Sequence, residues 1–209
     1  MKRFAWAVIA LLPAATLVAC GGPKVMVPPR IDLRQHEILG IIEFRSSNEG
    51  ELGPLATQKF TEAVRRDQGL VRIVALGTEA EALREAGSRK LDRVAYQSLG
   101  QKQGLSTIFT GELVVSDIRP TVRVTPDLRN AGVSADIDAT LTAQMIETAS
   151  GASIWSRSAS VTMRVGDISM LGGRDVVFDA EDPERAYGPL VETLVERVTR
   201  EFQATWERR

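Results

Sequence analysis

Apolar and polar residues alternate along two long stretches in the second half of the chain. Every second residue is apolar over 133–145, and the alternation returns over 154–165. A period of two is typical of a strand with one buried and one solvated face. The intervening Ala149-Ser150-Gly151 suits a three-residue hairpin loop, with Gly151 in the left-handed conformation of a bulge. We therefore expect a long antiparallel hairpin.

The hairpin predicts specific pairs across its two strands. Met145 lies opposite Trp155 on the apolar face, and Asp136 lies opposite Arg164 on the solvated face. An opposite-charge pair of this kind contributes about 0.2 to 1 kcal/mol. Arg157 is the one charge on the apolar face. A slip by one residue would turn the apolar face outward, so burial of that face fixes the register.

The first part of the domain predicts strands and helices in turn. Short apolar runs at 38–44, 71–76 and 106–118 are typical of strands. Apolar residues at helical spacing predict a helix over 51–67. Two further helices follow, one capped by Thr78 and ending near Gly87, the other capped by Asp92 and ending at Gly104.

A long helix is predicted at the carboxyl end. Asp182 would cap it and Pro183 would occupy its first turn. We expect its apolar stripe to cover the sheet, although a partner-binding coiled coil is an alternative. The stripe consists of Tyr187, Leu190, Val191, Leu194, Val195, Val198, Phe202 and Trp206.

These elements predict a single α/β domain over residues 37–209. Its sheet would be mixed or antiparallel, with a long C-terminal β-hairpin and helices packed on it. The whole chain of 209 residues is 44% hydrophobic and 25% charged, which is ordinary for a globular protein of one domain.

The amino terminus has the order of a secretory leader over residues 1–19. Lys2 and Arg3 precede an apolar stretch over 4–18, and the small Ala19 precedes Cys20, the only cysteine. The apolar stretch is shorter than the roughly 20 residues of a spanning helix. Leu17-Val18-Ala19-Cys20 resembles a bacterial lipobox. Alternatives are a plain secretory signal or a buried thiol.

The lipobox resemblance implies cleavage between Ala19 and Cys20, with a covalent diacylglycerol and an N-acyl lipid on Cys20. Several acyl chains anchor a protein durably. Gly21 stands where aspartate would favour inner-membrane retention in this class, so the outer membrane, facing the periplasm, is the expected location. Removal of the leader changes the net charge from −1 to −3, and nothing suggests nucleic acid as a partner.

Residues 20–36 are expected to be a lipidated tether. Gly21, Gly22, Pro23, Pro28 and Pro29 suppress regular structure, and the segment lacks apolar periodicity. About 17 residues reach at most roughly 55 Å when extended. A domain on so short a tether would work close to its membrane.

Four short patterns carry a resemblance to a group of envelope proteins. They are Leu39-Gly40-Ile41-Ile42-Glu43-Phe44, the Leu-Gly joint at 99–105, Ile108-Phe109-Thr110-Gly111-Glu112, and Glu147-Thr148-Ala149-Ser150-Gly151 before Ile154-Trp155. Their order resembles the curli secretion channel lipoprotein, the penicillin-binding-protein activator lipoprotein and the amino-terminal domain of the Tol propeller protein. The resemblance implies non-catalytic work in the envelope.

Pore-forming hairpins, which the curli channel carries, have little room here. A spanning strand needs about 9 to 11 residues with one apolar face. The segment Arg119 to Gly132 contains Pro120 and Pro126, which disfavours lipid exposure. A second segment reads as a surface loop, or alternatively as a contact for a partner or membrane surface. Its apolar residues are Ile168, Met170, Leu171, Val176, Val177 and Phe178.

Catalytic chemistry finds little support. His36 is the only histidine, and no serine lies in a nucleophile-elbow motif. Asp136 and Asp138 share a strand face but cannot fill a calcium shell alone, and zinc would need cysteine or histidine clusters. We therefore expect no catalytic residues, no metal and no cofactor besides the lipid.

The interpretation that follows is a scaffold or accessory component of an envelope assembly or export system. Its partners would be the membrane, through the lipid, and an envelope protein or a second copy of the chain. The alternatives are a regulator of a cell-wall synthase and, less favoured, a periplasmic hydrolase.

Overall fold

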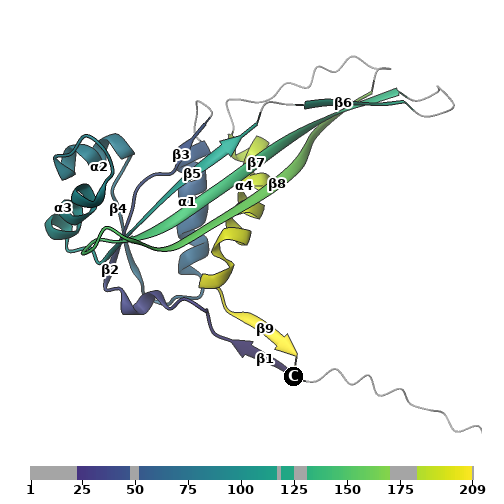
Figure 1. Cartoon of the computed structure of the whole chain (residues 1–209). Helices are drawn as coiled ribbons and strands as arrows, with labels where there is room; N and C mark the ends of the chain where they lie inside the picture. Colours follow the sequence, from purple (N-terminus) through teal and green to yellow (C-terminus); the bar gives the residue numbers. More distant parts are fainter. Residues whose placement is uncertain (1–22, 48–51, 117–118, 125–130, 170–182, 209) are drawn as a thin grey trace, which may run out of the picture.

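The computed structural model describes residues 23–47, 52–116, 119–124, 131–169 and 183–208 (Figure 1). The helices are α1 (Leu52–Arg65), α2 (Glu79–Ala86), α3 (Arg93–Gln103) and α4 (Pro183–Thr199), with 3-10 turns η1 (Leu33–Gln35) and η2 (Arg200–Phe202). The strands are β1 (Lys24–Val27), β2 (Ile38–Ile41), β3 (Arg45–Ser46), β4 (Arg72–Ala75), β5 (Thr107–Val115), β6 (Arg119–Val124), β7 (Ala131–Glu147), β8 (Ser153–Ser169) and β9 (Thr205–Arg208).

Seven of these described strands form one mixed sheet. β2 pairs in parallel with β4 and β5, and β3 pairs in parallel with the later part of β5. β7 is antiparallel to β5, β6 and β8, so the long hairpin continues the sheet (Figure 1). The predicted fold class is confirmed: an α/β domain with a mixed sheet, a long C-terminal hairpin and packed helices.

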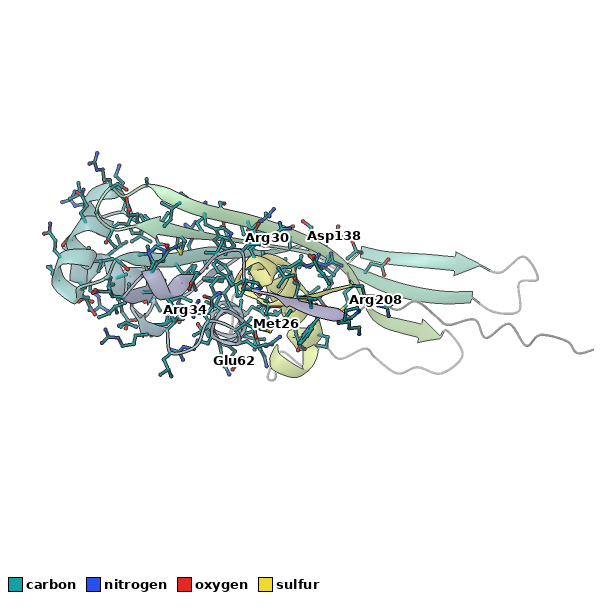
Figure 2. The ribbon with its side chains drawn as sticks, turned by 90° about the horizontal axis from the view of Figure 1, so that it is seen from below. Met26, Arg30, Arg34, Glu62, Asp138 and Arg208 are labelled. Carbon is teal, nitrogen blue, oxygen red and sulfur yellow. The ribbon has the colours of Figure 1, made fainter. Side chains whose placement is uncertain are left out.

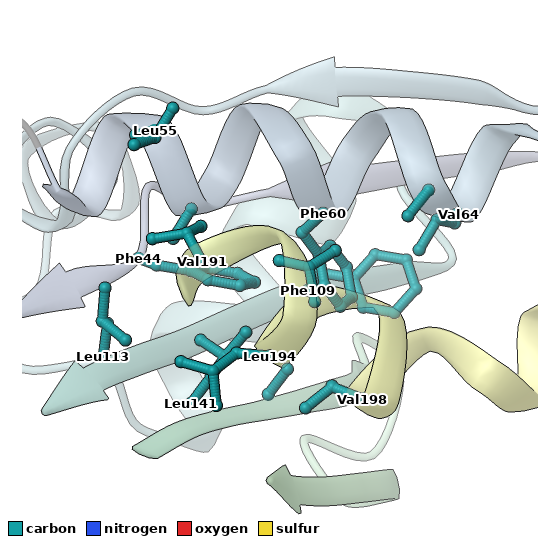
Figure 3. Packing of buried hydrophobic residues seen from close by; sticks show 14 of the residues in the cluster. Phe44, Leu55, Phe60, Val64, Phe109, Leu113, Leu141, Val191, Leu194 and Val198 are labelled. Atoms are coloured by element: carbon teal, nitrogen blue, oxygen red, sulfur yellow. The ribbon is translucent and has the colours of Figure 1, made fainter. Parts of the chain in front are cut away.

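Helices cover both faces of this sheet at β5. Ile108 and Phe109 are consecutive and fully buried, but they belong to different apolar clusters because side chains alternate along a strand. Phe109 packs with residues of α1 and α4 (Figure 3). Ile108 packs with residues of α2 and α3. The larger cluster, on the α1 and α4 side, contains most of the aromatic residues.

Local capping signals confirm the predicted boundaries of α2 and α3. Thr78 and Glu81 form a reciprocal capping box at the start of α2, and Asp92 accepts a hydrogen bond from Ala95 N–H at the start of α3. Gly87 and Gly104 end these helices at φ of 71° and 67°. A glycine adopts this left-handed conformation without the steric cost of a Cβ.

The predicted register of the long hairpin is confirmed between Asp136 and Met145. Met145 pairs with Trp155, and Asp136 pairs with Arg164. Gly151 has the expected left-handed φ of 68°. A register shift that was not predicted lies between residues 145 and 146 and leaves Ile154 unpaired. A second shift leaves Val165 unpaired.

Two expectations for the ends of the domain are wrong. Residues 20–36 are not free of regular structure, because they contain β1 and η1, and Leu33 is fully buried. The C-terminal helix stops at Thr199 and does not reach Trp206, which lies in β9. β1 and β9 pair with each other instead, so the folded part includes residues well before residue 37. Asp182, the expected cap, lies outside the described residues.

Candidate functional site

The residues predicted for lipidation and partner contact fall mostly outside the described part of the chain. Ala19 and Cys20 precede it. Among the apolar residues predicted for partner contact, Ile168 lies in β8, opposite Val133. The others lie outside the described residues: Met170, Leu171, Val176, Val177 and Phe178.

The residues considered for catalysis or metal binding lie in two separate places. His36 follows η1 and is half-buried, and this burial lowers the pKa of its imidazole. Asp136 and Asp138 lie on β7, where Asp138 Oδ1 accepts a hydrogen bond of 2.7 Å from Thr162 Oγ1. Over the described ranges, no three histidine, cysteine, aspartate or glutamate residues are grouped so as to hold a metal ion.

The most distinctive surface is a two-stranded ribbon formed by the two ends of the domain. We call β1 and β9 together the terminal ribbon. The strands are antiparallel, with Lys24 opposite Arg208 and Met26 opposite Trp206. The ribbon projects from the body beneath α1 and α4 (Figure 1), and Figure 2 shows Met26 and Arg208 on it.

The terminal ribbon has two different faces because side chains alternate along each strand. Its outer face consists of Lys24, Met26, Trp206 and Arg208, all exposed. The exposed fractions are 57% for Met26 and 65% for Trp206. Val25 and Val27 point to the inner face and are half-buried. The outer face is therefore basic and apolar and has no cover within the described residues.

The inner face of the ribbon borders a cavity of about 700 Å³, lined on its other sides by residues of β8, α4 and η2. We call this cavity the arginine groove. Val27, Thr205 and Glu207 line it from the ribbon. Across from them it is lined by Arg157, Arg197, Arg200 and Glu201, and Arg30 lies at its edge near the ribbon.

Glu201 organises the floor of the arginine groove. Its Oε2 accepts hydrogen bonds from Trp155 Nε1 at 2.9 Å and from Arg157 Nε at 3.1 Å. The hydrogen bonds from Arg157 and then from Trp155 hold the pKa of Glu201 below its ordinary value. This contact explains the one charge predicted on the apolar face of β8. Arg197 Nη1 also donates to the Ser160 carbonyl of β8 at 2.9 Å.

Gln68 holds the two chain segments from which the ribbon extends. It is buried, and its Oε1 accepts a hydrogen bond of 2.8 Å from Leu33 N–H. Its Nε2 donates to the carbonyls of Ile31 at 2.9 Å and Phe202 at 2.7 Å. One amide side chain therefore satisfies three backbone groups, two from the segment after β1 and one from the segment before β9.

Sequence reasoning missed the terminal ribbon. The signal that could have found it is weak: Val25 and Val27 alternate with Lys24 and Met26, and β9 contains threonine and tryptophan, which favour strands. Flanking glycine and proline residues favoured a tether over a strand. Trp206 fitted a helical stripe equally well.

Comparisons with known proteins give similar structures but no sequence family. No protein-family model matches the chain, and no curated protein does. The PelC dodecamer from Paraburkholderia phytofirmans is 15% identical, with a TM-score of 0.45, covering 87% of this chain and 97% of that chain. The LpoB C-terminal domain from Escherichia coli is 16% identical, with a TM-score of 0.37, covering 61% and 83%.

Lipoprotein GNA1162 from Neisseria meningitidis is also similar, at 15% identity and a TM-score of 0.32, covering 78% of this chain and 98% of that chain. The sequence patterns resemble three envelope proteins. One of them, the penicillin-binding-protein activator lipoprotein, is represented among the similar structures by LpoB. A likeness to the curli channel or to the Tol protein is not shown.

None of the described helices combines the length and the apolar character of a membrane span.

Proposed function

We propose that this chain is a lipoprotein of the outer membrane that faces the periplasm and works through protein contacts. Cleavage before Cys20 and acylation of that cysteine would supply the anchor. The domain would act as a scaffold or accessory component of an envelope assembly or export system. In this proposal it has no catalytic role and no cofactor besides the lipid.

The position of the terminal ribbon relative to the lipobox carries the proposal. Leu17-Val18-Ala19-Cys20 closes the leader, and β1 begins at Lys24, only four residues after the cysteine. Four extended residues span at most roughly 14 Å. A lipid on Cys20 would therefore hold the terminal ribbon against the bilayer and keep the domain close to it, where it could contact other envelope proteins.

The same distance disfavours regulation of a cell-wall synthase in the inner membrane. Such a regulator needs a long disordered linker to cross the wall, unless its partner spans the gap. The sequence predicts a short tether between Cys20 and the domain, and β1 and η1 leave even less of that tether without regular structure. A partner close to the outer membrane fits this geometry better.

Metabolic labelling with palmitate tests the anchor. We expect the wild-type chain to incorporate label and to fractionate with the outer membrane. Cys20→Ser should abolish labelling and leave the leader attached. Labelling that survives Cys20→Ser, or a wild-type chain that takes no label, would contradict the anchor.

Photocrosslinking in intact cells tests the contact function. A probe at Leu171 is expected to capture an envelope protein or a second copy of the chain. Leu70 is a suitable control position because it is fully exposed after α1. Equal capture from both positions would contradict a specific contact at Leu171.

A further inference from the structure

We propose that the outer face of the terminal ribbon binds the surface of an anionic lipid bilayer. Met26 and Trp206 would enter the boundary between headgroups and acyl chains, while the two basic residues would contact lipid phosphates. The proposal rests on the proposed anchor at Cys20, which brings a membrane within reach of the ribbon.

The first observation that supports membrane binding is a pair of large, solvent-exposed apolar side chains. Met26 and Trp206 lie directly opposite each other, so they form one patch rather than two scattered residues. Their exposed fractions, 57% and 65%, leave most of each side chain in water. Tryptophan is enriched where membrane meets water, because its ring is apolar and its N–H is polar.

The second support is the charge of the same face. Lys24 and Arg208 flank the apolar pair, and they are also opposite each other. The ribbon's one acidic residue, Glu207, points the other way and lines the arginine groove. A face with two cations and no anion is complementary to phosphate headgroups, which attract basic residues close to the bilayer surface.

The third support is the place of the ribbon on the chain. Lys24 is the strand residue nearest to Cys20, and Arg208 is its partner, so the basic end of the ribbon is the end nearest to the anchor. With a reach of at most roughly 14 Å, the bilayer is the surface that this face meets first. A second copy or a protein partner would have to enter between the ribbon and the membrane.

The chain supplies its own reporter for a test. Removal of the leader eliminates Trp6 and leaves two tryptophans, of which Trp155 is buried and Trp206 is exposed. The processed, lipid-bearing protein would be extracted from membranes and placed in vesicles with brominated acyl chains. The vesicles would contain phosphatidylcholine alone or with phosphatidylglycerol. Fluorescence then reports contact with bromine, and acrylamide reports contact with water.

We expect bromine to quench Trp206, more strongly with phosphatidylglycerol present. The quenched component should vanish in Trp206→Phe and weaken in Lys24→Glu and Arg208→Glu. The matched control is Val94→Trp in a Trp206→Phe background, which adds a tryptophan at an exposed position of α3, away from the ribbon (Figure 1). That residue should be quenched by acrylamide but not by bromine.

Vesicle flotation separates the anchor from the ribbon contact. If the protein floats while Trp206 stays open to acrylamide and is not quenched by bromine, the ribbon contact is overturned and the anchor stands. If the protein floats while Trp206 is shielded from both quenchers, a protein surface covers the ribbon and the lipid proposal is overturned. If the protein does not float, both the anchor and the contact fail.

Discussion

The two tryptophans of the described domain lie in opposite environments. Trp155 is 8% exposed, its ring packs 4.7 Å from that of Phe202, and its N–H donates to Glu201. Trp206, only four residues beyond Phe202, is 65% exposed. The body thus buries the ring of its tryptophan and gives its N–H a hydrogen-bond acceptor. The terminal ribbon leaves its tryptophan exposed on the surface.

This contrast indicates two different sources of order. The body is held by buried packing, including a chain of ring contacts from Phe44 through Phe60 and Phe109 to Phe202. A two-stranded ribbon has too little packing to be stable alone. The ribbon depends on the body through Gln68 and through Asp67, whose Oδ2 accepts a hydrogen bond from Ala204 N–H just before β9. Substitutions should therefore act differently in the two regions.

The largest effect is expected from Phe109→Ala in the body. Phe109 is fully buried and makes edge contacts with the rings of Phe60, Trp155 and Phe202. The cavity left behind should lower the free energy of unfolding by about 3–5 kcal/mol, measured by urea denaturation. Val114→Ala, at an exposed position of the same strand, is the control. Equal losses would contradict the assignment of Phe109 to the core.

The next effect is expected where the body holds the ribbon. Gln68→Ala leaves two backbone carbonyls and one N–H, buried or partly buried, without this partner, so we expect a loss of about 2–4 kcal/mol. Hydrogen exchange of the ribbon amides should also accelerate. Gln58→Ala, on the exposed side of α1, should change neither quantity. A ribbon that keeps its protection in Gln68→Ala would show that it does not depend on this amide.

A smaller effect, visible in acid, is expected from Glu201. Its pKa is lowered in the folded state, so it contributes stability that is present above its ordinary value of 4.5 and is lost as pH falls through the lowered value. Urea midpoints should therefore fall more on acidification in wild type than in Glu201→Gln. Parallel pH profiles for the two proteins would contradict the role of the Arg157 contact.

The smallest effect on folding is expected from Trp206→Ala. Because the side chain is largely exposed, its removal should change the free energy of unfolding by no more than about 0.5 kcal/mol. Urea denaturation followed by circular dichroism measures this change. A loss comparable to that of Phe109→Ala would place Trp206 in the core and would erase the contrast between the two regions.

The register of the long hairpin could be predicted between Asp136 and Met145 because its evidence is local. Two alternating stretches lie next to each other in sequence, and burial of one face excludes a slipped register. The unpaired Ile154 and Val165 could not be predicted, because an extra residue at a strand end barely disturbs the alternation. The caps at Thr78 and Asp92 were also local signals and were confirmed.

The terminal ribbon could not be predicted because its evidence is not local. Lys24–Val27 and Thr205–Arg208 are four residues each and lie at opposite ends of the domain. In the sequence, the apolar stripe of α4 extends past Thr199 to Phe202. In the structure, Phe202 is buried, but it lies in the 3-10 turn η2 and not in the helix. In the candidate site, the sequence identified Arg157 as the one charge on an apolar strand face. Its partner Glu201 lies on another element, and nothing in the sequence distinguishes it from other polar residues.

Gln68 also has a mechanical consequence. In a chain held at Cys20, tension would enter the domain along β1 and reach the backbone at Ile31 and Leu33, which both hydrogen-bond to this side chain. The same amide binds the Phe202 carbonyl, so the pull would be shared with the C-terminal segment. The resistance of the domain to pulling would then depend on the buried hydrogen bonds of Gln68. The exposed ribbon could move without unfolding the core.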